Sequence, residues 1–183
     1  MKIVVIGDFH IPSRAKKIPD WIVGKIIEEK PDMIACTGDL ESEDTLSFLH
    51  SLAKTKCVSG NMDWLDLPDH QEFEVGDIRI GLIHGKGIVP RGDINQLNRF
   101  AEMMRANILI HGHTHKLSTE LAYGRLFVNP GTATGVWGGA TGGEPQSFII
   151  IEINGKHIIV RKFVDEKEVV ERYEYRDGSV RPV

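Results

Sequence analysis

The sequence predicts an α/β fold in which two β-sheets pack face to face with helices on the outside. Three observations support this prediction. Short apolar runs alternate with amphipathic stretches through the first 60 residues, and turn signals separate most of the later apolar runs. No repeat or linker divides the 183 residues. Because a chain of this length can bury one core, we expect a single domain over residues 1–183.

The N-terminal part predicts parallel strands joined by helices. Three short apolar runs are predicted strands, and two stretches with apolar side chains at helical spacing are predicted helices. In chain order these elements are residues 2–6, 19–30, 33–37, 41–52 and 57–58. Pro31 lies just beyond the first helix, and acidic residues fill the first turn of the second, where the helix dipole favours them. This order implies a parallel sheet with right-handed crossovers.

The later part predicts antiparallel hairpins around one further helix, residues 94–105. Two-residue turn signals stand between apolar runs at Gly76-Asp77, Tyr123-Gly124 and Asn154-Gly155. The predicted strands are residues 72–75, 78–83, 117–122, 125–128, 147–153 and 157–164, with residues 169–175 as an edge strand. We therefore expect a parallel first half followed by an antiparallel second half.

The composition excludes several classes of protein. A net charge of −4 provides no basic surface for nucleic acid, and no run reaches the roughly 18 apolar residues of a membrane span. The N-terminus lacks the features of a signal peptide, so the cytoplasm is the expected compartment. Cys36 and Cys57 each lie in an apolar run, so we expect core residues rather than a disulfide or a zinc thiolate site.

The stretch Ile-Leu-Ile-His-Gly-His-Thr-His, residues 108–115, joins an apolar run to three histidines. On an extended segment His113 and His115 would share one face, because side chains two residues apart point the same way. Two imidazoles on one face are plausible metal ligands. A polar strand end facing water is the alternative.

Polar residues also follow four other predicted strands. The full set is Asp8 with His10, Asp39, Asn61, His84, and His113 with His115. In open α/β sheets, ligands bind outside the carboxyl ends of the strands, so these side chains are expected to converge. Each motif alone could be an ordinary turn, because Gly-Asp and Gly-Asn are common there. Five coincident strand ends favour a shared site.

The motifs Gly-Asp-Phe-His, Gly-Asp-Leu, Gly-Asn-Met-Asp, His-Gly and Gly-His-Thr-His, in this order, resemble the calcineurin-like metallophosphoesterase superfamily. The phrases Gly-Leu-Ile-His-Gly and Asn-Pro-Gly-Thr-Ala-Thr-Gly are similar to those of small prokaryotic phosphodiesterases and of their relative, the vacuolar-sorting subunit of retromer. The resemblance covers most of the chain. It implies a four-layer α-β-β-α metallophosphatase sandwich.

The resemblance also implies two divalent metal ions. Carried over position by position, one ion would be held by Asp8, His10, Asp39 and His115, and the other by Asp39, Asn61, His84 and His113. The carboxylate of Asp39 would bridge the ions, about 3.5–4 Å apart in two-metal hydrolases. Nitrogen and oxygen ligands without a thiolate suit Mn²⁺, Fe²⁺, Ni²⁺ or Zn²⁺, and the sequence does not choose among them.

The implied activity is hydrolysis of a small phosphodiester, in preference to a monoester, by in-line attack of a metal-bridging hydroxide. Two divalent ions lower the pKa of a bound water toward about 7. The expected catalytic residues are Asp39, His10 and Asp63, and the expected substrate contacts are Asn61, Arg14 and Arg91. Surface solvation is the alternative for both arginines, and a turn-capping role or the orientation of a ligand is the alternative for Asp63.

One position departs from the superfamily pattern. Many members carry histidine after the Gly-Asn to assist the leaving group, and here that position is Met62. A thioether can neither donate a proton nor carry charge. Assistance would have to come from His10 or a bound water, or be absent, so we expect modest turnover and a preference for good leaving groups.

Three further expectations concern the surroundings of the site. His111 is expected to pack or to hydrogen-bond a ligand rather than to bind metal. The glycine-rich loop at residues 135–143, with Trp137, is expected to be either a flap over the site or a long hairpin connection. A retromer-like interaction scaffold is the alternative function, although all seven ligand positions are kept. The natural substrate stays open, and a homo-oligomer is compatible with the sequence.

Overall fold

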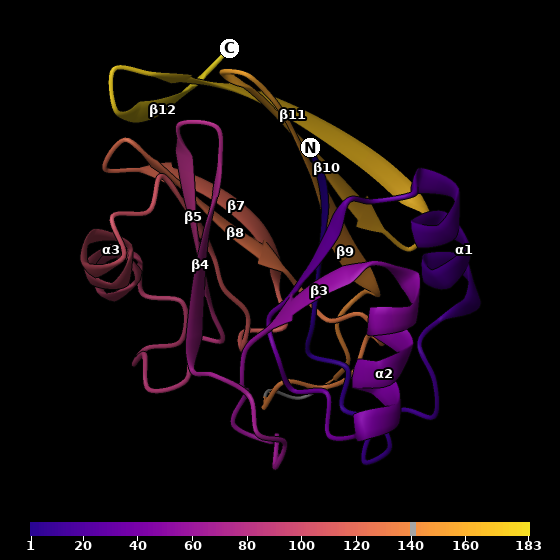
Figure 1. The fold of residues 1–183 in the computed structure, drawn as a ribbon. Coiled ribbons are helices and arrows are strands. Elements are labelled where there is room, and N and C mark those ends of the chain that lie inside the picture. The colour runs from indigo at the N-terminus through magenta and orange to yellow at the C-terminus, as the bar shows by residue number, and fades with distance from the viewer. Residues whose placement is uncertain (140–141) are drawn as a thin grey trace.

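The computed structural model describes residues 1–139 and 142–183 and has four layers, with helices on both sides of two stacked sheets (Figure 1). The helices α1 (Asp20–Glu29) and α2 (Glu43–Leu52) cover one sheet, and α3 (Ile94–Met103) covers the other. The predicted sandwich of two sheets with helices outside is therefore confirmed. Within the described residues, no helix is long and apolar enough to cross a membrane.

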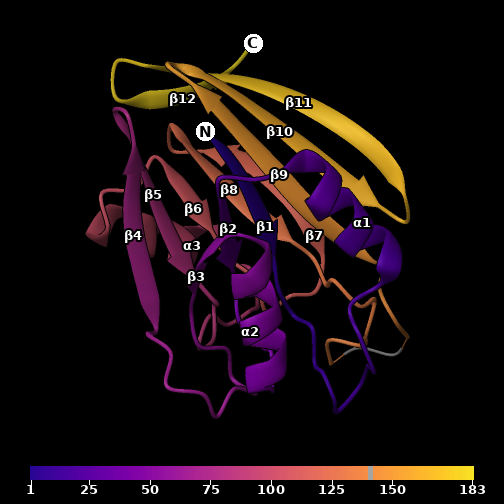
Figure 2. The same ribbon diagram turned by 45° about the vertical axis from the view of Figure 1, so that its right-hand side comes forward.

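The first sheet combines the two ends of the chain. In spatial order its strands are β12 (Ser179–Pro182), β11 (Lys167–Arg176), β10 (His157–Val164), β9 (Ser147–Asn154), β1 (Lys2–Ile6), β2 (Met33–Cys36) and β3 (Lys54–Cys57). As predicted, β1, β2 and β3 are parallel, although β3 lies at Lys54–Cys57 and not at residues 57–58. The antiparallel β9 lies beside β1, and Figure 2 shows β9, β10 and β11 side by side with α1 over them.

The second sheet contains the middle of the chain. Its spatial order is β4 (His70–Val75), β5 (Ile78–Ile83), β6 (Ile108–Ile110), β8 (Arg125–Pro130) and β7 (Leu117–Ala122). The prediction of an antiparallel second half is wrong here, because β5, β6 and β8 are parallel to one another. The helix α3 makes the crossover from β5 to β6, and such a crossover returns the chain in the same direction.

Two local predictions also need correction. Residues 169–175 are not an edge strand, because β11 pairs with both β10 and β12. The turn that leads into β12 is Asp177-Gly178, an Asp-Gly hairpin signal in which both residues have positive φ. The last predicted turn is displaced by one residue, since Asn154 ends β9 and Gly155-Lys156 forms the loop. The other two predicted hairpins are confirmed.

Three apolar clusters fill the spaces between the layers. The largest lies between the sheets and includes Ile3 and Val5 of β1 with Ile80 and Ile110 of the second sheet, all fully buried. Another cluster packs α1 and α2 against the first sheet, and a third packs α3 against the second. Burial of this apolar surface drives the layers together, and it leaves the strand ends at one edge of the sandwich free for polar residues.

Arg161 ties α1 to the first sheet. Its guanidinium lies 2.8 Å from Glu29 of α1 and 3.0 Å from Glu152 of β9, and it also contacts Glu168 of β11. Hydrogen bonds from Arg161, with further help from Lys2, lower the pKa of Glu29 to about 2. The Glu29 side chain is 10% exposed, so solvent screens this interaction weakly.

We predict that Glu29→Gln destabilises the fold at neutral pH. A lowered carboxyl pKa stabilises the folded state above the pKa of the unfolded chain, near 4.3, and that contribution is lost as the pH falls toward about 2. The variant should lose roughly 1.5–3 kcal/mol at pH 7. Urea unfolding at pH 7, 4 and 3 should show the difference from wild type shrinking below pH 4. Glu28→Gln is the matched control, because Glu28 is 69% exposed. A difference that stayed constant with pH would contradict the assignment.

Candidate metal centre

The polar residues expected at the strand ends lie together at one edge of the sandwich. Asp8 and His10 follow β1, Asp39 follows β2, and Asn61 follows β3 in the first sheet. His84 follows β5, and His113 and His115 follow β6 in the second sheet. The site therefore spans both sheets, because the carboxyl ends of their parallel strands point to the same edge.

The backbone at these positions is not extended, contrary to the prediction for the His-x-His stretch. Strand β6 ends at Ile110, and His113 and His115 have φ of 70° and 61°. Asp8, His10 and Asp39 are also left-handed, with φ between 50° and 54°. Such conformations cost a non-glycine residue of order 1–3 kcal/mol and persist only where the surroundings hold them. Here His10 N–H donates to the Asp39 carbonyl at 2.9 Å, which holds two of these loops against each other.

The side chains form two groups that share Asp39. One group contains Asp8, His10, Asp39 and His115, and the other contains Asp39, His84 and His113. Within each group, one ligand atom per residue lies within 4.8 Å of the others. The Asn61 Oδ1 atom lies 3.0 Å from His84 Nε2, which places it beside the second group. The structure thus brings together all seven residues that the sequence suggested.

The histidine nitrogens face one another across the site. His10 Nε2 lies 3.1 Å from His115 Nε2, and His84 Nε2 lies 3.1 Å from His113 Nδ1. Burial lowers the pKa of His84, His113 and His115 to about 4, so these rings are neutral near pH 7. A neutral imidazole carries one lone pair, so facing ring nitrogens at this distance suit a cation between them when both present a lone pair.

The remaining ring nitrogens orient these lone pairs. His84 Nδ1 donates to the Thr37 carbonyl at 2.7 Å, and His115 Nδ1 donates to the Val136 carbonyl at 2.9 Å. His10 Nδ1 lies 2.6 Å from a carboxylate oxygen of Glu41. In metal sites, a partner of this kind fixes the tautomer and directs the other nitrogen to the ion.

The carboxylates fit a cation as well. Asp8 Oδ1 is buried and has no hydrogen-bond partner among the described residues, and burial together with Asp39 raises the pKa of Asp8. Asp39 Oδ2 lies 3.4 Å from both His10 Nε2 and His84 Nε2, while its Oδ1 accepts the Met62 N–H at 2.8 Å. One oxygen of Asp39 is therefore held by the backbone and the other faces both histidine groups. This donor set fits metal ions with nitrogen and oxygen ligands.

Asp63 holds the loops that carry Asp39 and Asn61. Its two carboxylate oxygens accept four backbone N–H groups at 2.8–2.9 Å, those of Asp39, Leu40, Glu41 and Gly60. Gly60 is required at this close approach, since an added Cβ would lie 2.1 Å from Asp39 Oδ1. Because both oxygens are engaged by the backbone, Asp63 positions the loops rather than facing the cavity.

Glu41 is the residue of the site that sequence reasoning missed. The sequence placed it in the first turn of a helix, but α2 begins at Glu43 with the Ser42 side chain as its cap. Glu41 is left-handed at φ 67° and only 8% exposed. The available signal in the sequence was its position two residues after Asp39. In the structure the buried Glu41 carboxylate needs a polar partner, and that partner is His10.

A short segment, residues 136–139, closes over the centre and is called the strap below. Its three consecutive carbonyls each accept one hydrogen bond from the site: His115 Nδ1 binds Val136, Arg14 binds Trp137 at 2.6 Å, and Arg91 binds Gly138. Arg14 also stacks over the Trp137 ring, 4.7 Å from its centroid. Both arginines therefore line the small cavity over the metal centre, which measures about 110 Å³, together with Asp39, Asn61 and three of the histidines.

The other expectations for this region can be placed as well. His111 is buried, belongs to neither group, and lies 3.3 Å from the Asn129 side chain. Met62 is 43% exposed and provides only its N–H, to Asp39. Residues 140 and 141 lie outside the described part of the chain, so the flap interpretation of residues 135–143 stays a prediction there.

We predict that Asp63→Asn weakens metal binding and lowers stability together. The amide would offer one acceptor and turn an NH₂ group toward backbone N–H donors. Loss of a supporting partner of this kind typically costs 10–100-fold in metal affinity, and buried unsatisfied donors cost about 1–3 kcal/mol each. Zn²⁺ titration calorimetry and urea unfolding of the metal-free protein measure the two effects. Asp66→Asn, at an exposed position of the same loop, should change neither, and an unaltered affinity in Asp63→Asn would refute the positioning role.

Comparison with known proteins identifies the family. The model of the calcineurin-like phosphoesterase superfamily domain matches residues 1–156. The chain is 39% identical, over 73% of its length and 78% of the relative's, to a probable metallophosphoesterase of Methanothermobacter thermautotrophicus.

Solved structures agree with this. The wild-type Vps29 of Entamoeba histolytica, in a complex with Zn²⁺, is 32% identical with a TM-score of 0.86 and covers 96% of this chain and 100% of that one. Vacuolar protein sorting 29 of Cryptosporidium parvum is 29% identical with a TM-score of 0.83 and covers 100% and 95%. The two ligand groups around Asp39 thus occur in a chain that belongs to the calcineurin-like phosphoesterase superfamily.

Proposed function

We propose that this protein is a two-metal phosphodiesterase. The observation that carries the proposal is the shared Asp39, whose Oδ2 lies 3.4 Å from a histidine of each ligand group. A single ion would need only one of these groups. Two complete sets of donors on either side of one carboxylate are what a two-ion centre requires.

The charge of the site favours an anionic substrate. Two divalent ions bring four positive charges, and the carboxylates of Asp8 and Asp39 offset two of them. When bound, the ions would neutralise the phosphate and lower the pKa of a water so that it serves as the nucleophile. The nitrogen and oxygen donors suit Mn²⁺, Fe²⁺, Ni²⁺ or Zn²⁺. Zinc has support from the related Entamoeba Vps29, which is described as a Zn²⁺ complex.

The residues around the ions would bind and orient the phosphate. Arg14, Arg91 and Asn61 line the small cavity with the histidines. Guanidinium groups bind phosphate oxygens in bidentate pairs, so either arginine could exchange its strap carbonyl for a substrate oxygen. Leaving-group assistance would come from a bound water, because Met62 has no proton to donate, and His10 uses Nδ1 toward Glu41 and Nε2 in the ligand group. A diester is preferred over a monoester on the resemblance to small prokaryotic phosphodiesterases.

The Vps29 structures support a second candidate, an interaction scaffold that keeps its metal site. They match this chain over nearly its whole length, and one of them, from Chaetomium thermophilum, is a complex with a cyclic peptide. The two candidates differ in whether a bound metal supports turnover.

We predict that activity follows metal loading. Protein stripped of metal should be inactive, and Mn²⁺ or Ni²⁺ should restore hydrolysis of bis-4-nitrophenyl phosphate above that of 4-nitrophenyl phosphate. Asp39→Asn should lose most of this activity, because the amide cannot carry the shared negative charge, whereas Asp44→Asn on the exposed side of α2 should keep it. Full metal binding without any hydrolysis would favour the scaffold.

A further prediction concerns the leaving group. Without an acid at position 62, cleavage should depend steeply on how good the leaving group is. Rates for aryl diesters should fall as the pKa of the departing phenol rises, and Met62→His should flatten that dependence. Alkyl and nitrophenyl diesters cleaved at equal rates would show that another group already supplies the proton.

A further inference from the structure

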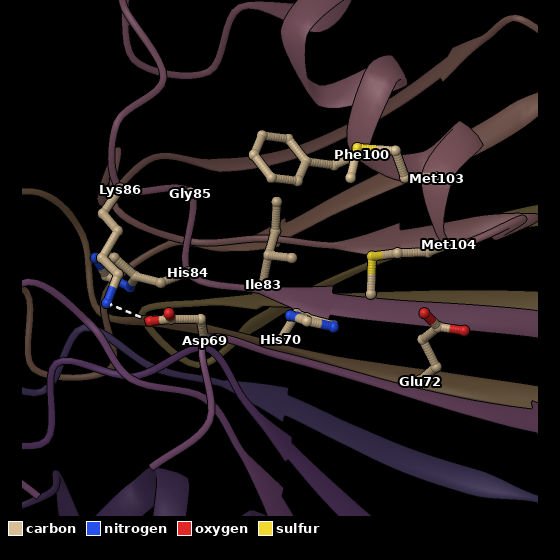
Figure 3. A pocket seen from close by; sticks show the side chains of 10 residues that line it. All are labelled: Asp69, His70, Glu72, Ile83, His84, Gly85, Lys86, Phe100, Met103 and Met104. Carbon is tan, nitrogen blue, oxygen red and sulfur yellow. Dashed lines mark ion pairs between the residues drawn. The ribbon is translucent and has the colours of Figure 1, made fainter. Parts of the chain in front are cut away.

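A second cavity lies beside the metal centre, between the start of β4, the end of β5 and the C-terminal end of α3 (Figure 3). It measures about 340 Å³, which is about three times the volume of the cavity over the metal centre and within the range of small-molecule pockets. We call it the side cavity. Of the residues that line it, only His84 belongs to a ligand group.

One wall of the side cavity is apolar. Phe100, Met103 and Met104 lie at i, i+3 and i+4 at the end of α3, so they share one side of the helix, and Ile83 of β5 completes the wall. Ile83 and Met104 are buried, whereas Phe100 is 38% and Met103 is 80% exposed. A flat aromatic ring next to two flexible thioethers fits an apolar group of varied shape.

The opposite wall is polar and carries more negative than positive charge. Asp69 pairs with Lys86 at 2.7 Å, and Glu72 adds a second carboxylate farther from the metal centre. The hydrogen bond from Lys86 lowers the pKa of Asp69, so this carboxylate stays charged near neutral pH. Two carboxylates against one ammonium repel an anion. The phosphate therefore belongs at the metal centre, and a second anionic group is disfavoured in the side cavity.

His84 and Gly85 lie between the side cavity and the metal centre. His84 lines the side cavity, and its Nε2 lies 3.4 Å from Asp39 Oδ2 in the metal centre. A Cβ on Gly85 would lie 3.8 Å from the Cβ of His113. The side cavity therefore begins one residue away from the second ligand group, on the other side of His84.

We infer that the side cavity binds the ester arm that is not displaced, and that it selects an arm that is apolar and uncharged, such as an aryl group. This inference rests on the proposed phosphodiesterase function. Met103 and Phe100 would be specificity-determining residues, because their exposed side chains line the cavity. The reaction itself would stay that of the metal centre.

The kinetic test compares two substrates with one leaving group, phenyl 4-nitrophenyl phosphate and methyl 4-nitrophenyl phosphate, on the metal-loaded protein. We expect kcat/KM to favour the phenyl arm by tenfold or more, the order of selectivity that an apolar pocket provides. In Met103→Glu this ratio should fall toward one, mainly through a higher KM for the phenyl substrate. Ile27→Glu, which places the same charge at an exposed apolar position of α1, should keep the wild-type ratio.

The second test reads binding without turnover. In protein labelled with ¹³C at the methionine methyls and loaded with Zn²⁺, diphenyl phosphate should shift the signals of Met103 and Met104, while those of Met1 and Met33 stay in place. Dimethyl phosphate should shift neither pair. If the signals of Met103 and Met104 shifted but no diester was hydrolysed, the proposed function would be refuted and the side cavity would still be a binding site. If diesters were hydrolysed with no preference for the phenyl arm, and the two signals did not shift, the inference about the side cavity would be wrong while the proposed function would stand.

Discussion

The buried carboxylate of Asp39 is the group on which the arrangement of the site depends. It is 1% exposed and stands among apolar strand ends, where an uncompensated charge costs several kcal/mol. Its Oδ1 accepts a backbone N–H from the loop after β3, and its Oδ2 faces one histidine from each ligand group. The loops from both sheets therefore meet at this side chain. A cation pair there would bind the oxygen and nitrogen atoms that face one another across the site.

Asp63 and Glu41 extend this dependence outward. Asp63 uses both oxygens to hold four backbone N–H groups of the Asp39 and Asn61 loops, and Glu41 holds His10. These contacts maintain left-handed backbone at Asp39 and Glu41, which a free chain would avoid. The fold thus stores local strain at its metal centre and offsets it with the apolar clusters between the layers.

The strap and the side cavity give the site two different surroundings. On one side, Arg14 and Arg91 hold consecutive strap carbonyls and create a small, positively charged cavity. On the other side, the end of α3 provides an apolar wall opposite carboxylates. A phosphate with one apolar arm matches this division, because each part of such a molecule meets the surroundings that its charge requires. A phosphate with two charged arms does not.

The sequence did not predict β12, and the metal-ligand roles follow from the family resemblance, but by itself it determined the approximate positions of the other strands, the helices and the seven polar residues at the strand ends. Local signals suffice for these, since apolar periodicity defines the elements and the polar residues stand directly after them. It also predicted two stacked sheets, but it could not assign strands to them. The pairing of β9 with β1, and of β5 with β6 and β8, joins segments far apart in the chain. The roles of Asp63, Glu41 and Arg14 depend likewise on contacts with distant loops. Tertiary packing decided them, because a hydrogen bond across 22 to 123 residues leaves no pattern in local sequence.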